Sequence, residues 1–389
     1  MNLENLKQQF HQVYPETGGS LLVAFAPGRV NLIGEHTDYN GGYVLPCAIN
    51  LGTFLVVRTN TLNRLRFISA NFDEKADIAV EHVRQKSHVT WVNYPLGVIN
   101  ELMDIGVQLT GMDFYFQGNI PAGAGLSSSA SVEMVTAAAL NQLYSLKLDL
   151  VSLVKLSQNA ENKFVGVNCG IMDQFAVGLS KKNHALFLNC QTLDYKLIPL
   201  YLKNYSVVIA NTNKKRALAK SKYNERVSEC ARAVSFISKH KPVSMLGDLS
   251  YQDGQLLLDT FIEDEMVRRR AKHVLTENQR VLDAVHSLTN GDLKQFGQLM
   301  NVSHSSLQHD YQVTGYELDV MVEEAQNIDG VIGARMTGAG FGGCSVNIVE
   351  NSQINYFISK VGENYFKRTG LTAAFYVIET ADGVKILEN

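Results

Sequence analysis

The stretch PAGAGLSSSASVEMVTAAA, residues 121–139, decides how this chain is interpreted. Gly123 and Gly125 precede a run of serines, and the alanines beyond them favour a helix. A loop that enters a helix in this way presents unpaired backbone N–H groups and the positive end of the helix dipole, which together favour an anion. The serine hydroxyls could donate to phosphate oxygens or bind a hard cation such as Mg²⁺.

Taken alone, this stretch is better explained as a capped helix that follows a turn. It is not a Walker A loop, because no Gly-Lys-Ser/Thr sequence follows it. Its interpretation as a phosphate-binding loop therefore depends on other segments of the chain.

The composition is that of a soluble globular protein, with 46% hydrophobic and 19% charged residues among 389. At about 150 residues per domain, this length predicts two or three domains. The net charge of −3 gives no field that would attract a nucleic-acid backbone. We therefore expect no nucleic-acid partner.

The cysteines and the N-terminal sequence indicate where the protein works. The five cysteines are odd in number, widely spaced and without a C-x-x-C pair: Cys47, Cys169, Cys190, Cys230 and Cys344. This pattern favours a reducing cytosol over a disulfide framework or a zinc site. The first residues, MNLENLKQQFHQVY, lack the apolar core of a signal peptide, and no run approaches the roughly 20 apolar residues of a membrane span. We expect a cytoplasmic protein without a membrane segment.

Hydrophobic spacing predicts the elements around the central loop. A helix is expected over residues 3–13, where Leu3, Leu6, Phe10 and Val13 recur at helical spacing. Strands are expected at 21–26, 52–58, 65–68, 113–117, 184–190 and 205–211, with a helix at 149–164. Residues 216–325 are predicted to be mostly helical, and a strand after a Gly-rich loop (334–349), a helix (353–366) and a last strand (372–378) follow.

Strands and helices that do not alternate strictly predict an α+β fold rather than a doubly wound sheet. The change to helical sequence places a domain boundary near residue 200. We expect an N-terminal domain over residues 1–200 and a C-terminal domain over 201–389, from which the final strand could return to the N-terminal domain.

Two further segments carry unusual combinations of residues. GRVNLIGEHTDYNGG, residues 28–42, places Arg29, Glu35, His36 and Asp38 within ten residues, before an Asn-Gly-Gly turn with hairpin chemistry. RMTGAGFGG, residues 335–343, is a second Gly-rich loop. Its glycines could approach a substrate or pack against the other motifs, and we assign them no catalytic role.

Together the three segments resemble the three signature motifs of the GHMP small-molecule kinases, and the first is similar to that of the galactokinases. The resemblance runs along essentially the whole chain, in the same order and spacing. It implies a two-domain α+β GHMP kinase fold with the active site in the cleft between the domains. It also implies ATP-dependent phosphorylation of α-D-galactose at the anomeric hydroxyl, the first committed step of galactose utilisation, with Mg²⁺ as the cofactor. We expect a monomer.

The resemblance further assigns roles to individual residues. Asp173 would be the base that receives the proton of the anomeric hydroxyl, and Arg29 would stabilise the developing charge. The sugar would be held by Glu35, His36, Thr37, Asp38, Gly170 and Tyr223. The nucleotide phosphates would be wrapped by Gly123, Ala124, Gly125, Leu126, Ser127, Ser128 and Ser129. Ser69 would lie near the adenine, and Ser129 and Glu161 would serve the magnesium.

Physical chemistry agrees with these roles but leaves simpler ones open. Two carboxylates and an imidazole within four residues suit the hydroxyls of a monosaccharide, although a polar turn would use the same residue types. The Arg29 guanidinium could neutralise phosphoryl oxygens or form a structural ion pair with Glu35 or Asp38. Asp173 could cap a short helix, and Glu161 could lie on a solvated helix face.

Two other functions stay open at this point. One is a kinase for a related sugar, such as N-acetylgalactosamine or arabinose. The other is a non-catalytic galactose sensor, in which a damaged phosphate loop would be expected. The loop GLSSSAS, residues 125–131, is complete, which argues against the sensor.

Overall fold

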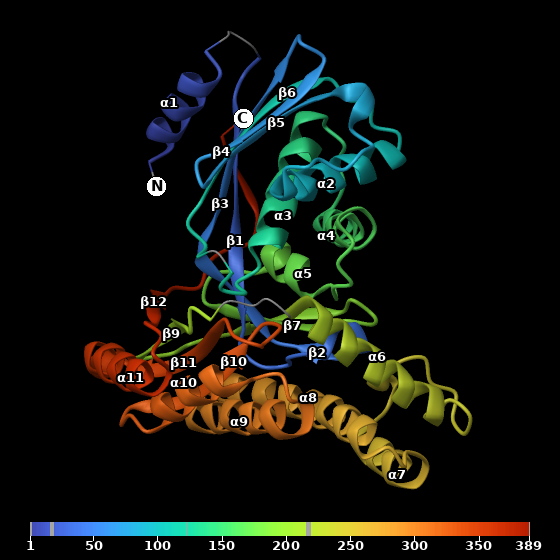
Figure 1. Cartoon of the computed structure of the whole chain (residues 1–389), viewed down its shortest axis with the longest axis vertical. Helices are drawn as coiled ribbons and strands as arrows, with labels where there is room; N and C mark the ends of the chain where they lie inside the picture. The colour runs from blue at the N-terminus through green and yellow to red at the C-terminus, as the bar shows by residue number, and fades with distance from the viewer. Residues whose placement is uncertain (1, 16–18, 122, 215–218, 389) are drawn as a thin grey trace.

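The structure, a computed structural model, describes residues 2–15, 19–121, 123–214 and 219–388. Figure 1 shows two parts stacked along the long axis, an upper part built on a tall twisted sheet and a lower part with most of the C-terminal helices. Both ends of the chain lie in the upper part (Figure 1). Strand β1, Leu22–Asn31, runs down the upper sheet to the junction of the two parts.

The upper part contains a six-stranded sheet in the order β13-β1-β3-β6-β4-β5, in which only β4 and β6 are parallel neighbours. Its remaining strands are β3 Pro46–Asn60, β4 Arg64–Ser69, β5 Phe72–Ala79, β6 Gly111–Gly118 and β13 Lys385–Glu388. Helix α1, Leu3–Val13, covers one face through Leu6 and Phe10. The other face is covered by α2 Asn93–Asp104, α3 Ser128–Leu143, α4 Leu150–Asn159 and α5 Met172–Leu179. A turn of π-helix, Ala160–Val165, continues α4.

The lower part contains a four-stranded antiparallel sheet in the order β10-β11-β9-β12. Its strands are β9 Tyr205–Asn211, β10 Val331–Thr337, β11 Cys344–Glu350 and β12 Ala374–Ile378. The helices of this part are α6 Ala219–Ile237, α7 Tyr251–Phe261, α8 Glu265–Thr289, α9 Leu293–Ser306, α10 Tyr316–Gln326 and α11 Ile354–Thr369. A three-stranded sheet of β2 Tyr43–Val44, β7 His184–Asn189 and β8 Tyr195–Pro199 lies at the junction. Short helical turns occupy Asp38–Asn40, Val80–His82, Thr90–Val92, Leu246–Asp248, Leu307–Tyr311 and Asn351–Gln353.

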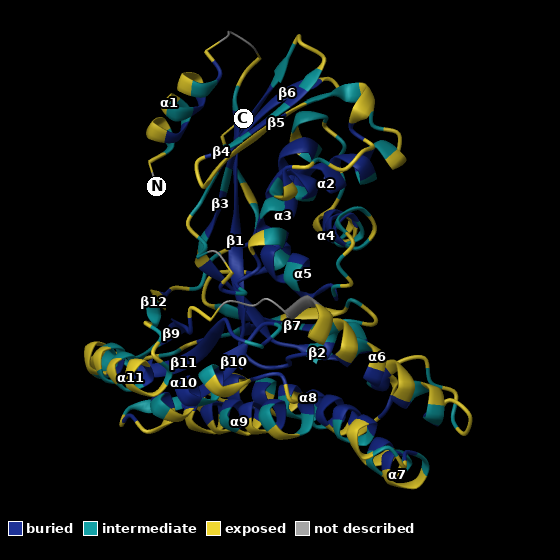
Figure 2. Cartoon of the chain, viewed as in Figure 1, coloured by how far each residue is buried: buried dark blue, intermediate teal, exposed yellow. Residues whose placement is uncertain are grey.

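The two parts are joined by a common hydrophobic cluster and by chain segments that cross between them. One hydrophobic cluster joins Val30 and Leu32 of the first motif to Ile209 and Val346 of the lower sheet, and Figure 2 shows β1, β10 and β11 as buried. The final strand β13 pairs with β1, with Ala24 opposite Ile386. The α+β class is confirmed. The division near residue 200 stays a prediction, because the chain crosses between the parts more than once.

Most of the elements expected from hydrophobic spacing are present, and two coincide in full with helix α1 and strand β9. Helix α2 and strands β2, β5, β8, β10 and β13 were not predicted, and the expected last strand at 372–378 corresponds to β12 rather than to β13. The Asn-Gly-Gly turn does not form a tight hairpin: β1 pairs with β3, and residues 32–45, which include a short helical turn and β2, connect them. Within this segment, Tyr43–Val44 pairs with β7 instead. Among the described residues, every helix is too short or too polar to span a membrane.

Candidate active site

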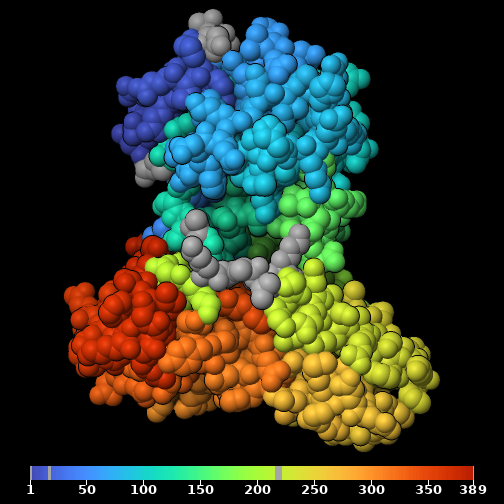
Figure 3. Space-filling model, viewed as in Figure 1, coloured from blue at the N-terminus to red at the C-terminus, as the bar shows by residue number. Residues whose placement is uncertain are grey.

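A cavity of about 300 Å³ lies between the two parts of the molecule. Figure 3 shows the surface hollowed at this junction. The cavity is lined by residues of the first motif, by residues 167–173 before and within α5, by α6, and by Gly338 and Ala339 of the third motif. Tyr94 of α2 and Glu161 complete the lining. Residues from the N-terminal and C-terminal halves of the sequence therefore line one cavity.

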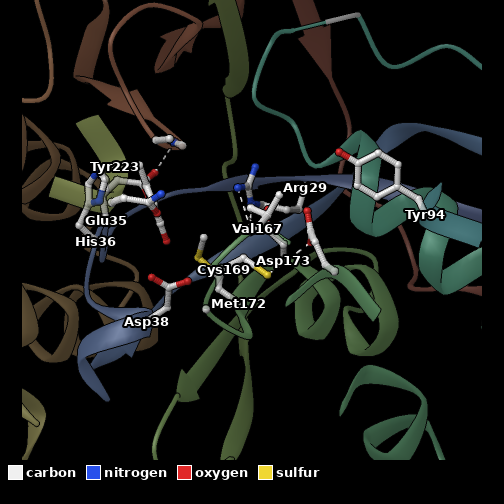
Figure 4. Close-up of a pocket in the computed structure, with 15 residues that line it drawn as sticks. Arg29, Glu35, His36, Asp38, Tyr94, Val167, Cys169, Met172, Asp173 and Tyr223 are labelled. Carbon is white, nitrogen blue, oxygen red and sulfur yellow. Dashed lines mark hydrogen bonds and ion pairs between the residues drawn. The ribbon is translucent and has the colours of Figure 1, made fainter. Parts of the chain in front are cut away.

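An ion pair between Arg29 and Asp173 lies in this cavity. Asp173 Oδ1 accepts hydrogen bonds from Arg29 Nε (2.9 Å) and pairs with Nη2 (2.7 Å), while Ser127 Oγ donates to Asp173 Oδ2 (2.7 Å). Arg29 Nη1 donates to the carbonyl of Gly125 at 2.8 Å. The guanidinium thus connects the end of β1, the Gly/Ser loop and the first turn of α5. In Figure 4 the pair lies between Glu35 and Asp38 on one side and Tyr94 on the other.

Glu35 is held by the third motif. Its Oε1 accepts hydrogen bonds from the Gly338 backbone N–H (2.7 Å) and the Thr337 hydroxyl (3.1 Å), and Asn31 Nδ2 donates to Oε2 (3.0 Å). Arg335 Nη1 lies 3.6 Å from Oε1. Gly338 has φ +85°, and a Cβ there would stand 3.1 Å from the Gly125 carbonyl. The third motif therefore packs against the first two and fixes the Glu35 carboxylate.

His36 is a strained and buried residue, with φ 62°. Its Nδ1 lies 2.9 Å from the Tyr39 hydroxyl, which in turn lies 2.8 Å from the Tyr311 hydroxyl. Its ring also contacts that of Tyr223, with centroids 5.7 Å apart. Burial lowers the pKa of His36 to about 3, so its ring is neutral and can act as both donor and acceptor. Strained backbone conformations of this kind cluster at active sites and ligand clamps.

Asp38 faces the cavity beside Gly170. A Cβ at residue 170 would overlap the Asp38 carboxylate, so only glycine allows this approach. Loss of hydration and the neighbouring charge of Asp173 raise the pKa of Asp38 to about 7. A carboxylate placed against another carboxylate is costly for the free protein, which is typical of a site arranged for a ligand.

Because the charged Asp38 carboxylate destabilises the folded protein, we expect Asp38→Asn to be more stable than the wild-type protein, and by an amount that depends on pH. The folded pKa of about 7 exceeds the unfolded value, so the folded state binds more protons between about pH 4 and 7 and loses stability as the pH rises. We expect Asn, which has no charge to desolvate, to raise Tm by at least about 2 °C at pH 8 and by much less at pH 5. Differential scanning calorimetry at both pH values measures this, with the exposed Asp194→Asn as a control. An equal Tm difference at both pH values would contradict the prediction.

A second cavity, of about 350 Å³, lies beside the Gly/Ser loop. Gly123, Ser128 and Ser129 line one side, and Ser69 with Phe72 and Trp91 line the other. The rings of Phe72 and Trp91 are stacked, with centroids 5.9 Å apart. Tyr94 lines both cavities and so marks where they adjoin. A flat apolar group and a chain of anionic groups would fit here, the latter along the loop and the N-terminus of α3.

Comparison with known proteins decides the family. The galactokinase galactose-binding signature matches residues 8–59, and the GHMP kinase N-terminal and C-terminal domains match residues 93–181 and 284–367. A galactokinase from Clostridium tetani is 49% identical over 98% of this chain and 97% of its own length. One from Streptococcus thermophilus is 46% identical over 100% of both chains. The chain belongs to the galactokinase family.

Solved structures place this galactokinase-family chain in the GHMP kinase fold. The galactokinase of Lactococcus lactis, solved in complex with galactose, is 41% identical, covers 99% of this chain and 100% of its own, and superposes with a TM-score of 0.96. The mevalonate kinase of Methanococcus jannaschii, 20% identical with a TM-score of 0.66, shares the fold. The predicted two-domain GHMP kinase fold is therefore confirmed.

The fold brings most of the predicted site residues of this galactokinase-family chain together. Those that line the first cavity are Arg29, Glu35, His36, Asp38, Glu161, Gly170, Asp173 and Tyr223. Thr37 is not among the described residues that line it, since its side chain is buried and its hydroxyl lies 2.9 Å and 2.7 Å from the carbonyls of Gly34 and Tyr43. The Ser127 hydroxyl bonds to Asp173. Leu126 is buried, and its carbonyl accepts from the Arg29 backbone N–H at 3.2 Å.

Sequence reasoning missed a pair of buried side chains beside Glu161. Gln174 Nε2 donates to Oε2 of Glu161 (2.7 Å) and to Oε2 of Glu133 (3.0 Å). Burial and the charge of Asp173 raise the pKa of Glu161 to about 6, and hydrogen bonds from Ser129, Cys169 and Gln174 oppose this rise. Burial and the neighbouring Glu161 raise the pKa of Glu133 well above its usual value. Glu133 lies among mainly apolar residues of its helix, and Gln174, although it directly follows Asp173, precedes the apolar residues 175–177, so neither formed a recognisable motif.

Proposed function

We propose that the chain transfers the γ-phosphoryl group of ATP to the anomeric hydroxyl of α-D-galactose, giving α-D-galactose 1-phosphate and ADP. The observation that carries the proposal is the Arg29–Asp173 pair, which lies where the two cavities adjoin, against the Gly/Ser loop. The galactose-binding signature at residues 8–59 and the galactose complex of the Lactococcus lactis relative support the choice of sugar.

The first cavity is the proposed galactose site. Glu35 and Asp38 offer carboxylate acceptors, and His36 and Tyr223 offer groups that can donate or accept. Gly170 contributes backbone beside Asp38. Because Glu35 is already fixed by Thr337 and Gly338, its oxygens are held in place before the sugar binds, and less ordering is needed on binding.

The second cavity is the proposed nucleotide site. Its apolar wall of Phe72 and Trp91, with Ser69 nearby, suits the adenine. The backbone and hydroxyls of residues 123–129 would hold the phosphates at the N-terminus of α3.

Ser129 and Glu161 fit the proposed role as magnesium ligands, since both supply hard oxygen donors and the Ser129 hydroxyl lies close enough to lower the pKa of Glu161. Among the described residues, no group of three or more His, Cys, Asp or Glu side chains is arranged to hold a metal ion. Mg²⁺ typically takes one or two protein ligands and completes its shell with water and phosphate oxygens. When bound, Mg²⁺ would neutralise charge on the phosphate oxygens.

The proposed roles of Asp173 and Arg29 follow from their contacts. Asp173 would orient the anomeric hydroxyl and accept its proton as the phosphoryl group transfers. Arg29, which stays charged, would stabilise the transferring oxygens while holding the Asp173 carboxylate in a fixed orientation.

A coupled ADP-release assay with ATP, Mg²⁺ and a panel of monosaccharides tests the proposal. We expect galactose to give the highest kcat/KM, with galactose 1-phosphate as the product by ³¹P NMR. A higher kcat/KM for N-acetylgalactosamine or arabinose would assign the chain to a related sugar. Galactose binding without ADP release would indicate a sensor.

Location and assembly belong to the same proposal. We propose a cytoplasmic monomer, in line with five free cysteines, which suit a reducing compartment. Size-exclusion chromatography with light scattering would measure the mass directly, and a mass of about twice 43.1 kDa would contradict a monomer.

Gly170→Ala is expected to weaken galactose binding, because the added Cβ would displace the Asp38 carboxylate. We expect KM for galactose to rise at least about tenfold and KM for ATP to change less than about threefold, since a misplaced acceptor costs roughly 1–3 kcal/mol. Steady-state kinetics with each substrate varied in turn measures both constants. Gly362→Ala, in helix α11, where an added Cβ would stand 3.2 Å from Phe375 Cε2 and the backbone needs no left-handed conformation, is the control. An unchanged galactose KM would mean that Asp38 does not hold the sugar.

A further inference from the structure

Gln174 lies at the meeting point of three helical elements. It follows Asp173 in the first turn of α5, and its side chain is fully buried. Glu133 comes from α3, one helical turn beyond Ser129, and Glu161 comes from the turn of π-helix after α4. The elements that carry the proposed phosphate loop, magnesium ligand and base therefore converge on one amide.

The Gln174 amide nitrogen has two hydrogens and donates one hydrogen bond to each of two carboxyl groups. It lies 2.7 Å from Glu161 Oε2 and 3.0 Å from Glu133 Oε2. With the amide turned over, the Gln174 oxygen would face two carboxyl oxygens, so the chemistry of the site fixes the orientation. Gln174 Oε1 and Glu133 Oε1 are buried without a hydrogen-bond partner.

The hydrogen bonds that join Glu133, Gln174 and Glu161, called the bridge below, leave two buried oxygens without partners. This burial costs free energy that apolar side chains would avoid, so we expect the bridge to have a function. One function fits its position. Glu161 lies in the π-helical turn after α4, a feature that is frequent at functional sites. The Cys169 thiol lies 3.4 Å from Glu161 Oε2, and Gln174 Nε2, from α5 beside Asp173, makes the shorter contact of 2.7 Å.

We propose that Gln174, anchored by Glu133, is a positioning residue that holds the Glu161 carboxylate in register with Ser129 and Asp173 for magnesium binding. The proposal rests on the proposed role of Glu161 as a magnesium ligand. Residues that orient a metal ligand typically contribute 10- to 100-fold to metal affinity. The sugar site should depend little on Gln174, because Glu35 is held by Thr337 and Gly338.

The test is the affinity of the protein–ADP complex for Mn²⁺, used as a probe for Mg²⁺ and followed by electron paramagnetic resonance. Gln174→Met keeps the length of the side chain and removes the donor. We expect it to raise the Mn²⁺ dissociation constant at least about tenfold and the galactose dissociation constant less than about twofold. Gln326→Met is the matched control, since that amide also donates two hydrogen bonds, to Asn301 Oδ1 and the Ala334 carbonyl, far from the site.

Two further variants separate the possible outcomes. If Glu161→Gln leaves Mn²⁺ affinity unchanged, Glu161 is not a metal ligand and its proposed role fails. If Glu161→Gln weakens Mn²⁺ binding and Gln174→Met does not, the positioning role alone is overturned. Glu133→Met removes the anchor from the opposite end of the bridge and should weaken Mn²⁺ binding at least about threefold. If Gln174→Met does not fold, Glu133→Met takes its place in the test. An unchanged Mn²⁺ affinity of Glu133→Met would also overturn the proposal.

Discussion

Asp173→Ala is expected to lower kcat at least about 100-fold while galactose binding stays measurable. The carboxylate accepts from Arg29 and Ser127 and faces the proposed sugar site, so its loss removes both the proton acceptor and the group that orients the anomeric hydroxyl. A general base typically contributes 10²–10⁴-fold, and a loose phosphoryl-transfer transition state places Asp173 toward the lower end of this range.

Asp173→Asn separates orientation from proton acceptance. Asn keeps the shape of the side chain and an oxygen that can accept from Arg29, but it cannot take up a proton. If Asp173 is a base, both variants lose turnover to a similar extent. If Asp173 only orients the anomeric hydroxyl, Asp173→Asn retains most of the turnover. Single-turnover kinetics measures the chemical step, and Asp77→Ala, which breaks an exposed pair with Arg64 at 2.5 Å, is the control. Near-native turnover in Asp173→Ala would remove the residue from the mechanism.

The sequence singled out the residues that line the candidate site more readily than it could predict their contacts. Arg29, Glu35 and Asp38 were identifiable because they lie within one short motif. That Glu35 is held by the Gly338 backbone N–H could not be predicted, since the contact requires β10 to lie beside the end of β1 across about 300 residues of chain. The raised pKa of Asp38 comes from its burial and from the charge of Asp173, and both depend on segments that are distant in the sequence.

Other features lacked any local signal. Thr37 stands among sugar-binding candidates, yet its hydroxyl is used by the backbone of its own loop. Glu133 and Gln174 stand in helices whose other residues are largely apolar, where a single polar side chain gives no pattern. The elements themselves were predictable where one face is buried, as in α1. Strand β5 was not, because its side chains are mostly exposed and charged.

Arg29→Ala is expected to depress kcat at least about 100-fold and to raise either KM by a smaller factor. The guanidinium makes two contacts to Asp173 and one to the Gly125 carbonyl, from a side chain that is only 5% exposed. A charge enclosed in this way acts on the transferring phosphoryl group with little screening by water. Steady-state kinetics with galactose and ATP varied in turn measures the two effects, and Arg64→Ala is the control for loss of an Arg–Asp pair. A change in KM alone would mean that Arg29 only binds substrate.

Arg29→Lys decides whether the charge or the geometry matters. Lysine keeps the charge but presents one nitrogen, which cannot contact both Asp173 and Gly125 as the planar guanidinium does. We expect kcat between those of the wild-type protein and Arg29→Ala. Because the two side chains are in direct contact, the double variant Arg29→Lys/Asp173→Asn should lose less than the product of the single losses. Fully multiplicative losses would show that Arg29 and Asp173 act independently, and the proposed unit formed by this ion pair would then be wrong.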